Sequence, residues 1–325
     1  MLAGAILALA VAELAIRYFY EVHFVYDPEL GYLHAPGTMR RTGEAPPAVS
    51  TWTVGGLRRA RPPDEGRPRI LVLGDSFTEA AMIDDGRVYT DVLEVALPQY
   101  QFLNVGRTTL SMADYVAFAE VHERRFHPTW TIVQLNVEDL GNDAFDKSDR
   151  SSFTLSSDGE LELHKVIPPY KHGPTYWIRE RSMLAYFLRI RYREYRLAAT
   201  AVPPLFHGAT AGPTGVPTRE YPVEALLDRT ADAYETRITF ALIAPYAPHA
   251  PDDVSVVERR MTAHCAARGY SCVSTRVGYR RFSETGRAPF GFTTSAFNEG
   301  HLNAAGHALL ARVIAGELQR LHALL

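Results

Sequence analysis

The sequence predicts an α/β domain whose parallel sheet is covered by helices on both faces. Five apolar runs have the length of strands, and helical patterns separate most of them. The expected strands are 70–73, 102–105, 131–135, 238–243 and 272–274. Such continuous apolar runs are typical of strands buried on both faces, because helices then pack above and below the sheet. The predicted domain spans residues 69–325.

Helical periodicity places amphipathic helices between these strands. The expected helices are 88–97, 113–124, 254–268 and a last one from 303 to the C-terminus. The alternation stops between about residues 145 and 221, where a turn is expected at Ser156-Asp158-Gly159 and a strongly patterned helix near 178–197. This segment is too long for a simple crossover. We expect an insertion that forms either a lid beside the site or a helical appendage.

The first 20 residues differ in composition from the rest of the chain. Glu13 is the only charged residue before Arg17, and the other positions are apolar or small. The run is short for a membrane span of about 20 residues, and it lacks the basic start of a signal peptide. We expect an export signal or a single membrane anchor, with a buried helix as the alternative. Residues 21–68 are rich in proline and glycine, and we expect an extended lead-in that wraps the domain.

Composition excludes some classes of protein. Hydrophobic residues make up 46% of the 325 positions and charged residues 22%, which is typical of a globular protein. The net charge of -3 gives no electrostatic reason to expect a nucleic-acid partner. Cys265 and Cys272 are spaced for neither a zinc site nor a redox pair. They are expected to pair as a disulfide if the chain is exported, and to stay buried thiols if it is cytosolic.

Two polar residues are placed where a nucleophile and its base could meet. Ser76 follows the strand candidate 70–73 through Gly74-Asp75, and His301 lies just ahead of the last helix. Open α/β sheets bind ligands at the carboxyl ends of their strands. A serine at that edge with a distant histidine is consistent with a Ser–His nucleophile pair. The alternative is that Ser76 and His301 only cap helices.

Three sequence blocks resemble the SGNH (GDSL-type) hydrolase family from about residue 69 onward. The first is Leu71-Val72-Leu73-Gly74-Asp75-Ser76-Phe77-Thr78, the second is Asn104-Val105-Gly106, and the third runs from Asn298 to His307. Their order and spacing agree with the family pattern. The segment Asp27-Pro28-Glu29-Leu30-Gly31-Tyr32 also resembles membrane-anchored bacterial members. The resemblance implies a three-layer, flavodoxin-like sheet and an esterase that needs no metal or other cofactor.

The resemblance also implies roles for particular residues. Ser76 would attack an ester carbonyl, and His301 would take its proton and return it to the leaving group. The backbone N–H groups of Ser76 and Gly106 would bind the oxyanion, because each lies past a strand end. Asp75 would lie in the pocket. Gly106 is alternatively only a turn residue.

Two positions depart from the family pattern. Glu138, followed by Asp139, occupies the place of an oxyanion-binding asparagine, and a carboxylate repels a developing oxyanion. Asn136 or Asn142 could substitute as the donor, while Glu138 and Asp139 would line the pocket.

The third catalytic residue also differs. Asn298 stands where the family has an aspartate. Its carbonyl can orient His301 but cannot stabilise the imidazolium by charge. The chain therefore carries either a Ser–His–Asn arrangement or a dyad with another acid such as Glu299.

Other polar residues give weaker signals. Glu79 could line the pocket but is expected to be exposed in the first turn of a helix, and His307 is expected on the surface. His122, His127 and His264 lack companions at metal-ligand spacing, so no structural metal is expected. Nucleotide-binding glycine patterns are absent from the sequence.

The predicted function is a serine esterase that removes O-acyl groups, with acetyl esters on cell-envelope or exopolysaccharide glycans as the first choice. We expect it on the extracytoplasmic face of a bacterial envelope, held by its N-terminal segment. The alternatives are an O-acetyltransferase that uses the same site, a catalytically impaired glycan-binding or scaffold protein, and a cytosolic lipase-like enzyme with a buried first helix.

Overall fold

The structure is a computed structural model, and it divides the chain into two compact units. One comprises Met1–His23 with Lys171–Tyr221, and the other comprises Phe24–Tyr170 with Pro222–Leu325. The described residues are 2–19, 24–41, 48–59, 63–64, 66–108, 110–145, 147, 149–168, 182, 184–185, 187–188, 192, 221–244, 254–292 and 300–322.

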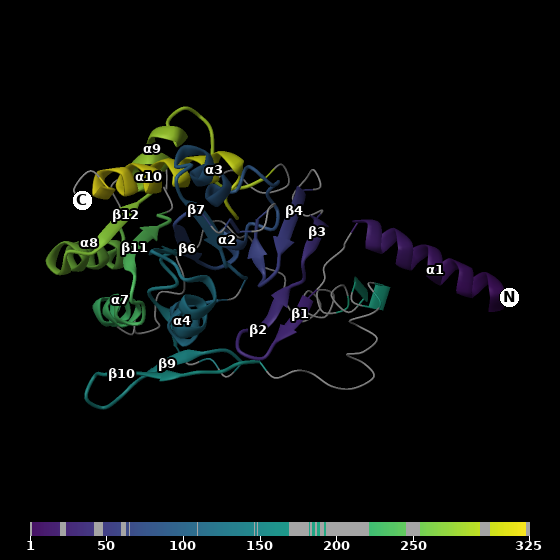
Figure 1. Cartoon of the computed structure of the whole chain (residues 1–325), viewed down its shortest axis with the longest axis horizontal. Helices are drawn as coiled ribbons and strands as arrows, with labels where there is room; N and C mark the ends of the chain where they lie inside the picture. The colour runs from purple at the N-terminus through teal and green to yellow at the C-terminus, as the bar shows by residue number, and fades with distance from the viewer. Residues whose placement is uncertain are drawn as a thin grey trace, which may run out of the picture. The chain divides into compact units, whose positions relative to one another are not determined.

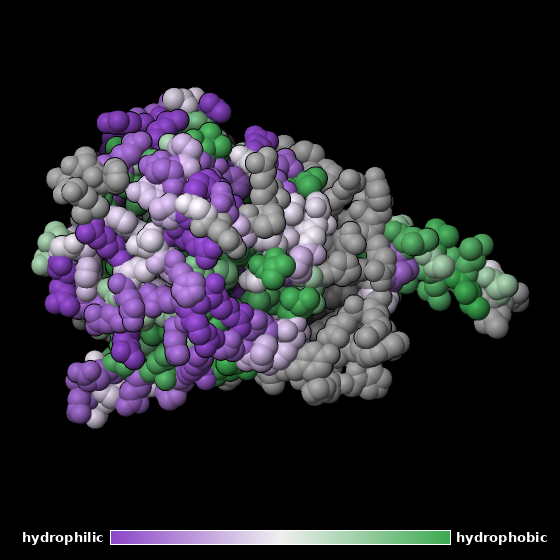
Figure 2. Space-filling view, viewed as in Figure 1, coloured by the Kyte–Doolittle hydropathy of each residue, from purple (hydrophilic) through white to green (hydrophobic). Residues whose placement is uncertain are grey.

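The smaller unit is built on helix α1 (Leu2–Phe19). Several of its large apolar side chains are exposed, and Figure 2 shows the helix as a mainly hydrophobic surface. They are Ile6, Leu7, Leu9, Val11 and Leu14. The Glu13 carboxylate accepts hydrogen bonds from Ser182 Oγ at 2.8 Å and from Leu184 N at 2.9 Å. None of the helices in the described part of the chain is long and apolar enough to cross a membrane.

The larger unit contains the predicted parallel sheet (Figure 1). Its five strands are β6 (Arg69–Leu73), β7 (Gln101–Asn104), β8 (Trp130–Leu135), β11 (Arg237–Leu242) and β12 (Ser271–Ser274). They pair in parallel in the order β12-β11-β8-β6-β7. This is the 2-1-3-4-5 order of flavodoxin-like sheets, in which the chain reverses its winding direction beside the first strand. The predicted sheet is therefore confirmed strand by strand.

Helices cover both faces of the sheet (Figure 1). On one face lie α3 (Tyr89–Ala96) and α10 (Ala304–His322), and on the other lie α4 (Met112–Phe126), α7 (Val223–Asp232) and α8 (Val256–Arg268). Helix α9 (Arg276–Ser283) follows β12. The three-layer architecture is confirmed, and α7 and α9 are additions that the sequence patterns did not predict.

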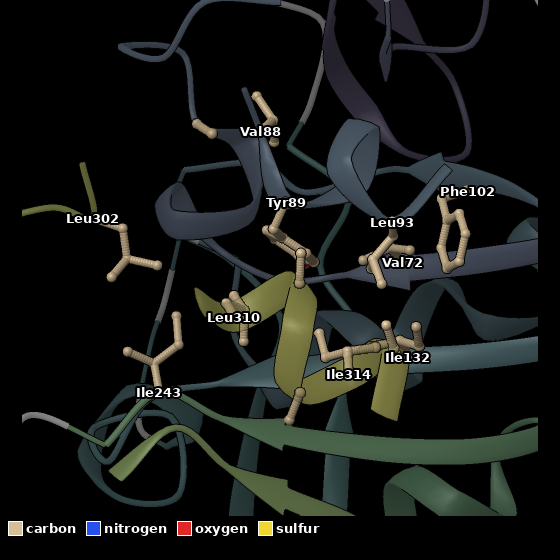
Figure 3. Packing of buried hydrophobic residues seen from close by; sticks show 14 of the residues in the cluster. Val72, Val88, Tyr89, Leu93, Phe102, Ile132, Ile243, Leu302, Leu310 and Ile314 are labelled. Carbon is tan, nitrogen blue, oxygen red and sulfur yellow. The ribbon is translucent and has the colours of Figure 1, made fainter. Parts of the chain in front are cut away.

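The core between the sheet and the α3–α10 layer fixes where the strands end (Figure 3). Val72 and Ile132 project from β6 and β8 against Leu93 of α3 and Ile314 of α10, and all four are fully buried. Burying a side chain of this size stabilises the fold by about 1.5–3 kcal/mol. The carboxyl ends of β6 and β7 are therefore held by packing on the regular part of the fold.

The lead-in forms two small sheets that the sequence patterns did not predict. Strands β1 (Phe24–Asp27) and β2 (Gly31–His34) make one, and β3 (Gly37–Arg41), β4 (Ala48–Thr53) and β5 (Leu57–Arg58) make the other. Leu30 and Leu33 pack on Phe118 of α4. Arg58 is buried, donates to Ile83 O at 2.8 Å and pairs with Asp85. This segment is part of the larger unit.

The described part of the insertion includes a hairpin of β9 (Ser152–Leu155) and β10 (Leu161–His164). The predicted turn is confirmed at its tip, where Gly159 N donates to Ser156 O and Gly159 has a φ of +84°. The helix predicted near 178–197 lies almost entirely outside the described residues.

The two cysteines form a disulfide. Cys265 in α8 is bonded to Cys272 in β12, with their Cα atoms 6.1 Å apart. The bond joins the end of a helix to the strand that follows it. Of the two states left open by the sequence, the structure contains the disulfide.

Candidate active site at the carboxyl edge of the sheet

The nucleophile candidate lies in a tight turn between β6 and helix α2 (Ser76–Glu79). Asp75 caps this helix, because its carboxylate accepts a hydrogen bond from Phe77 N at 2.9 Å. Gly74 is required for close packing, since a Cβ there would lie 2.0 Å from Thr78 Oγ1. The turn therefore leaves Ser76 at the carboxyl end of β6, as the sequence predicts.

The structure brings Ser76 and His301 together although 225 positions separate them. Ser76 Oγ and His301 Nε2 are 3.0 Å apart, which is hydrogen-bonding distance. The His301 ring lies against Phe77, with ring centroids 5.1 Å apart. Its loop is fixed by bonds from Gly291 N to His301 O at 2.9 Å and from Asn303 N to Pro289 O at 3.0 Å. A nucleophile–base pair needs this geometry.

Gly106 lies next to the nucleophile turn, but its N–H group is already used. It donates to Asn104 Oδ1 at 2.9 Å. A Cβ at Gly106 would lie 2.4 Å from Thr78 Cγ2 and 2.7 Å from Glu79 N, so glycine is needed here for contact with α2. The sequence argument correctly left this N–H outside the strand ladder but missed the Asn104 side chain. Gly106 N–H could donate to an oxyanion only if its hydrogen bond to Asn104 Oδ1 were broken first.

Asn136 lies directly behind the nucleophile turn. Its Nδ2 group donates to Asp75 Oδ2 at 2.9 Å, and its N–H donates to Asp139 Oδ2 at 2.8 Å. Asp139 N donates back to Asn136 Oδ1 at 3.1 Å. Asn136 therefore connects two acids, and Glu138, placed by the family alignment at the donor position, is exposed.

Burial dominates the electrostatics of these two acids. It raises the pKa of Asp75 to about 6, and the nearby Asp143 carboxylate adds to the increase. It also raises the pKa of Asp139 well above its ordinary value, with Asp75 contributing repulsion. An ionised Asp75 thus disfavours the ionisation of Asp139. The turn behind Ser76 is thus a place where little negative charge accumulates at mildly acidic pH.

Three residues of the predicted site lie wholly or in part outside the residues that the structure describes. Asn298 and Glu299, the candidates for orienting His301, lie outside the described residues. The backbone of Asn142 begins the short 3-10 helix η1 (Asn142–Ala144), but its side chain is outside the described part. These assignments stay predictions.

Two expectations for neighbouring residues are wrong. Glu79 is 4% exposed, and it binds His34 of the lead-in and Thr108 of the β7–α4 loop. His307 is 1% exposed, its Nδ1 accepts from Tyr89 N at 3.4 Å, and burial lowers its pKa to about 3. Their positions on helices predicted that the Glu79 and His307 side chains lie at the surface. Segments that are distant in sequence cover both of them. No signal within the local sequence reveals those partners.

Among the described residues, no group of three or more histidine, cysteine, aspartate and glutamate side chains could hold a metal ion. The site instead consists of a serine–histidine pair at the carboxyl edge of the first sheet strand, with its histidine ahead of the last helix. This placement on a 2-1-3-4-5 sheet agrees with all three blocks of the resemblance. The chain therefore has a flavodoxin-like α/β fold that carries Ser76 and His301 where the resemblance expects them.

No protein-family model and no curated protein matches the sequence. Solved structures to which the chain is similar include a lipolytic protein of the G-D-S-L family from Veillonella parvula, with a TM-score of 0.43, 11% identity, and coverage of 78% of this chain and 98% of that one. A two-domain esterase active on acetylated mannans has a TM-score of 0.42 and 14% identity, over 78% of this chain and 49% of the other. A catalytic mutant of an acetylxylan esterase from Geobacillus stearothermophilus has a TM-score of 0.40 and 15% identity, over 77% and 94%.

Proposed function

We propose that the chain is a serine ester hydrolase that removes O-acyl groups, with acetyl groups on cell-envelope or exopolysaccharide glycans as the first choice of substrate. The observation that carries the proposal is the 3.0 Å separation of Ser76 Oγ and His301 Nε2 at the carboxyl edge of the sheet. A serine hydroxyl is a weak nucleophile until an adjacent base accepts its proton. The preference for acetylated glycans is an expectation from the family resemblance.

The geometry supports a two-step reaction. Ser76 Oγ attacks the ester carbonyl while His301 Nε2 takes the hydroxyl proton, and collapse of the intermediate releases the alcohol with that proton. A water molecule then attacks the acyl-serine, again giving a proton to His301. The carboxylic acid leaves as Ser76 recovers the proton.

The tetrahedral intermediates need a hydrogen-bond donor for their oxyanion. Ser76 N–H is the best placed, because it begins α2 and donates to no other described residue in the structure. Asn136 and Gly106 are the next candidates, and each would first have to release its present acceptor, Asp75 or Asn104. We therefore expect a smaller rate enhancement than a site with several free donors provides.

The proposal is tested by labelling the full-length chain with a fluorophosphonate probe and by measuring turnover of p-nitrophenyl acetate. The wild-type chain should be labelled at Ser76, and Ser76→Ala should abolish both signals. His301→Ala should reduce the labelling rate by at least about 100-fold, since base catalysis contributes about 10²–10⁴. Serine hydroxyls elsewhere serve as the internal control, because peptide mapping must locate the label on Ser76 alone.

A folded wild-type chain that is not labelled would contradict the hydrolase proposal. It would favour the second candidate, a glycan-binding protein with an impaired site. The internal bonds of Gly106 and Asn136 are the observation that favours this candidate. Binding of acetylated and deacetylated glycans, unchanged by Ser76→Ala, would then support it.

If an acceptor sugar replaces water in the second step, the same site performs O-acetyl transfer. The products separate these reactions, because hydrolysis releases free acetate and transfer yields an acetylated sugar. An assay with an acetyl ester and a large excess of free glycan decides between them.

We also propose an extracytoplasmic location. The Cys265–Cys272 disulfide supports it, because disulfides persist mainly in oxidising compartments. Fractionation of cells that express the full-length chain tests both the location and the expected N-terminal anchor. Recovery in the cytosolic fraction would contradict this part of the proposal.

A further inference from the structure

A buried carboxylate lies one helical turn after the nucleophile candidate. Glu79 is the last residue of α2, three positions after Ser76, and its side chain is almost completely buried. A buried carboxylate is unfavourable unless hydrogen bonds replace the water it has lost. The hydrogen-bond partners of Glu79 therefore indicate the role of this buried carboxylate.

The two oxygens of Glu79 bind two different segments. Oε1 accepts a hydrogen bond from His34 Nε2 at 2.5 Å. Oε2 accepts from Thr108 N at 3.0 Å and also from the Thr108 hydroxyl. Glu79 thus connects the nucleophile turn to the end of β2 and to the loop after β7.

His34 is held in place by aromatic side chains of the lead-in. Its ring stacks on Trp52 of β4, with centroids 4.1 Å apart and planes at 27°, and it lies 4.8 Å from the ring of Phe24. His34 itself is 5% exposed. A ring packed against two aromatic side chains can present its Nε2 atom in only a narrow range of positions, so it fixes the position of the Glu79 carboxylate.

The β7–α4 loop lies against the same carboxylate. Thr108 is two residues after Gly106, whose missing Cβ permits contact with Glu79 N. Arg107, between them, donates to Leu30 O at 2.9 Å and to Tyr32 O at 2.8 Å. Glu79 from one side and the lead-in from the other therefore determine where Gly106 lies relative to Ser76.

We propose that Glu79 is a positioning residue of the hydrolase site, and that His34 acts with it to set the spacing between the Ser76 turn and the Gly106 loop. The inference rests on the proposed ester hydrolase function. Glu79 acts through Ser76 and Gly106 and contacts no reacting atom. A displacement of about 1 Å in such a site can reduce the rate about 100-fold.

The test compares four single variants of the full-length chain, one double variant and one control variant with the wild type. Glu79→Leu removes both acceptors, and Glu79→Gln keeps an acceptor for Thr108 and a group that can bond to His34. His34→Phe keeps the aromatic packing on Trp52 but removes the hydrogen bond, and His34→Gln retains a donor. Glu317→Gln is the control, because Glu317 is a half-buried acid paired with Arg320 and Ser271 at the opposite edge of the sheet.

We measure kcat and KM for p-nitrophenyl acetate and the fluorophosphonate labelling rate, each per folded molecule. Glu79→Leu and His34→Phe should lower kcat and the labelling rate 10- to 100-fold while KM changes less than threefold. Glu79→Gln and His34→Gln should recover most of the loss. The Glu79→Leu/His34→Phe double variant should be no worse than the poorer single variant, because the two residues act as one unit.

Unchanged kcat and labelling per folded molecule in Glu79→Leu and His34→Phe, even with a lower melting temperature, would overturn the positioning role. Additive losses in the double variant would overturn the partnership. If Glu79→Leu does not fold, His34→Phe decides the question alone. A wild-type chain that is not labelled at Ser76 refutes the hydrolase function and the positioning role together, whereas labelled wild type with equally labelled variants refutes only the latter.

Discussion

At the scale of single residues, burial sets the chemistry of the two acids behind Ser76. Asp75 both caps α2 and accepts from Asn136, burial raises its pKa, and its charge adds to the raised pKa of the buried Asp139. An acid whose pKa is raised by folding binds more protons in the folded chain than in the unfolded chain. The fold is then more stable on the acidic side of that pKa.

The Asp75→Asn variant tests this linkage. With a folded pKa of about 6 and an ordinary value of 3.8, Asp75 contributes stability below about pH 4 that is lost as the pH rises through 6. Each pKa unit corresponds to about 1.4 kcal/mol, so the loss is at most about 3 kcal/mol. The variant keeps an acceptor for Phe77 N and should show a shallower decline in the free energy of unfolding between pH 4 and 7.

Denaturant melts at several pH values measure that slope. Asp149→Asn is a suitable control, because the Asp149 side chain is 84% exposed and the variant should follow the wild type. Equal slopes in wild type and Asp75→Asn would contradict the pKa assignment.

The positions of Ser76 and His301 could be predicted from sequence, because strand ends and helix starts place them, while their catalytic roles stay predictions. It failed for Glu79 and His307, whose environments depend on chain segments far away in sequence. The position of a residue on an amphipathic helix indicates whether it lies on the polar face. Contacts with His34 and Tyr89, however, bury Glu79 and His307.

At the scale of elements, the lead-in is attached to the domain by a buried cation. Arg58 of β5 donates to Ile83 O, pairs with Asp85 and lies over the Trp52 ring at 5.2 Å. Asp85 in turn accepts from Thr51 N at 3.0 Å. The loop after α2 and the β4–β5 hairpin therefore share one polar network.

Arg58→Ala should destabilise the fold by about 3–5 kcal/mol, because removing one partner of a buried pair leaves the other uncompensated. Urea denaturation measures the change. Arg320→Ala removes an ion pair in which the arginine is exposed and Glu317 is half-buried, and it should cost less than about 1 kcal/mol. Similar losses of unfolding free energy in Arg58→Ala and Arg320→Ala would contradict the prediction that the buried ion pair stabilises the fold more than the pair of the exposed arginine.

The sheet strands and their covering helices could be predicted because their apolar patterns are long and regular. The β1–β5 hairpins could not, since Tyr26–Gly66 has frequent prolines and glycines and only short strands. Their pairing is determined by contacts with α4 and with the loop after α2, which no local pattern encodes.

At the scale of the whole molecule, the Cys265–Cys272 disulfide connects the elements that form the last crossover of the sheet. It joins α8 to β12, the edge strand that α10 also contacts. The closed loop is short, with a separation of seven positions. Its effect on stability is accordingly at the lower end of what disulfides contribute.

The Cys265→Ser/Cys272→Ser double variant should lose about 2–3 kcal/mol, the value that chain entropy gives for a loop of this size. Thermal melts of wild type with and without a reductant give an independent estimate. The reductant should lower the melting temperature of the wild type and leave the double variant unchanged. A wild-type melting temperature that is insensitive to full reduction would contradict this prediction.

The carboxylate of Glu13 has a practical consequence for producing this protein. Ser182 Oγ and Leu184 N both donate to it, so a recombinant chain that begins after α1 leaves two donors of the insertion without their acceptor. Activity lost on such truncation would therefore reflect a damaged insertion as well as the absence of α1. The full-length chain is the appropriate starting material for enzymology.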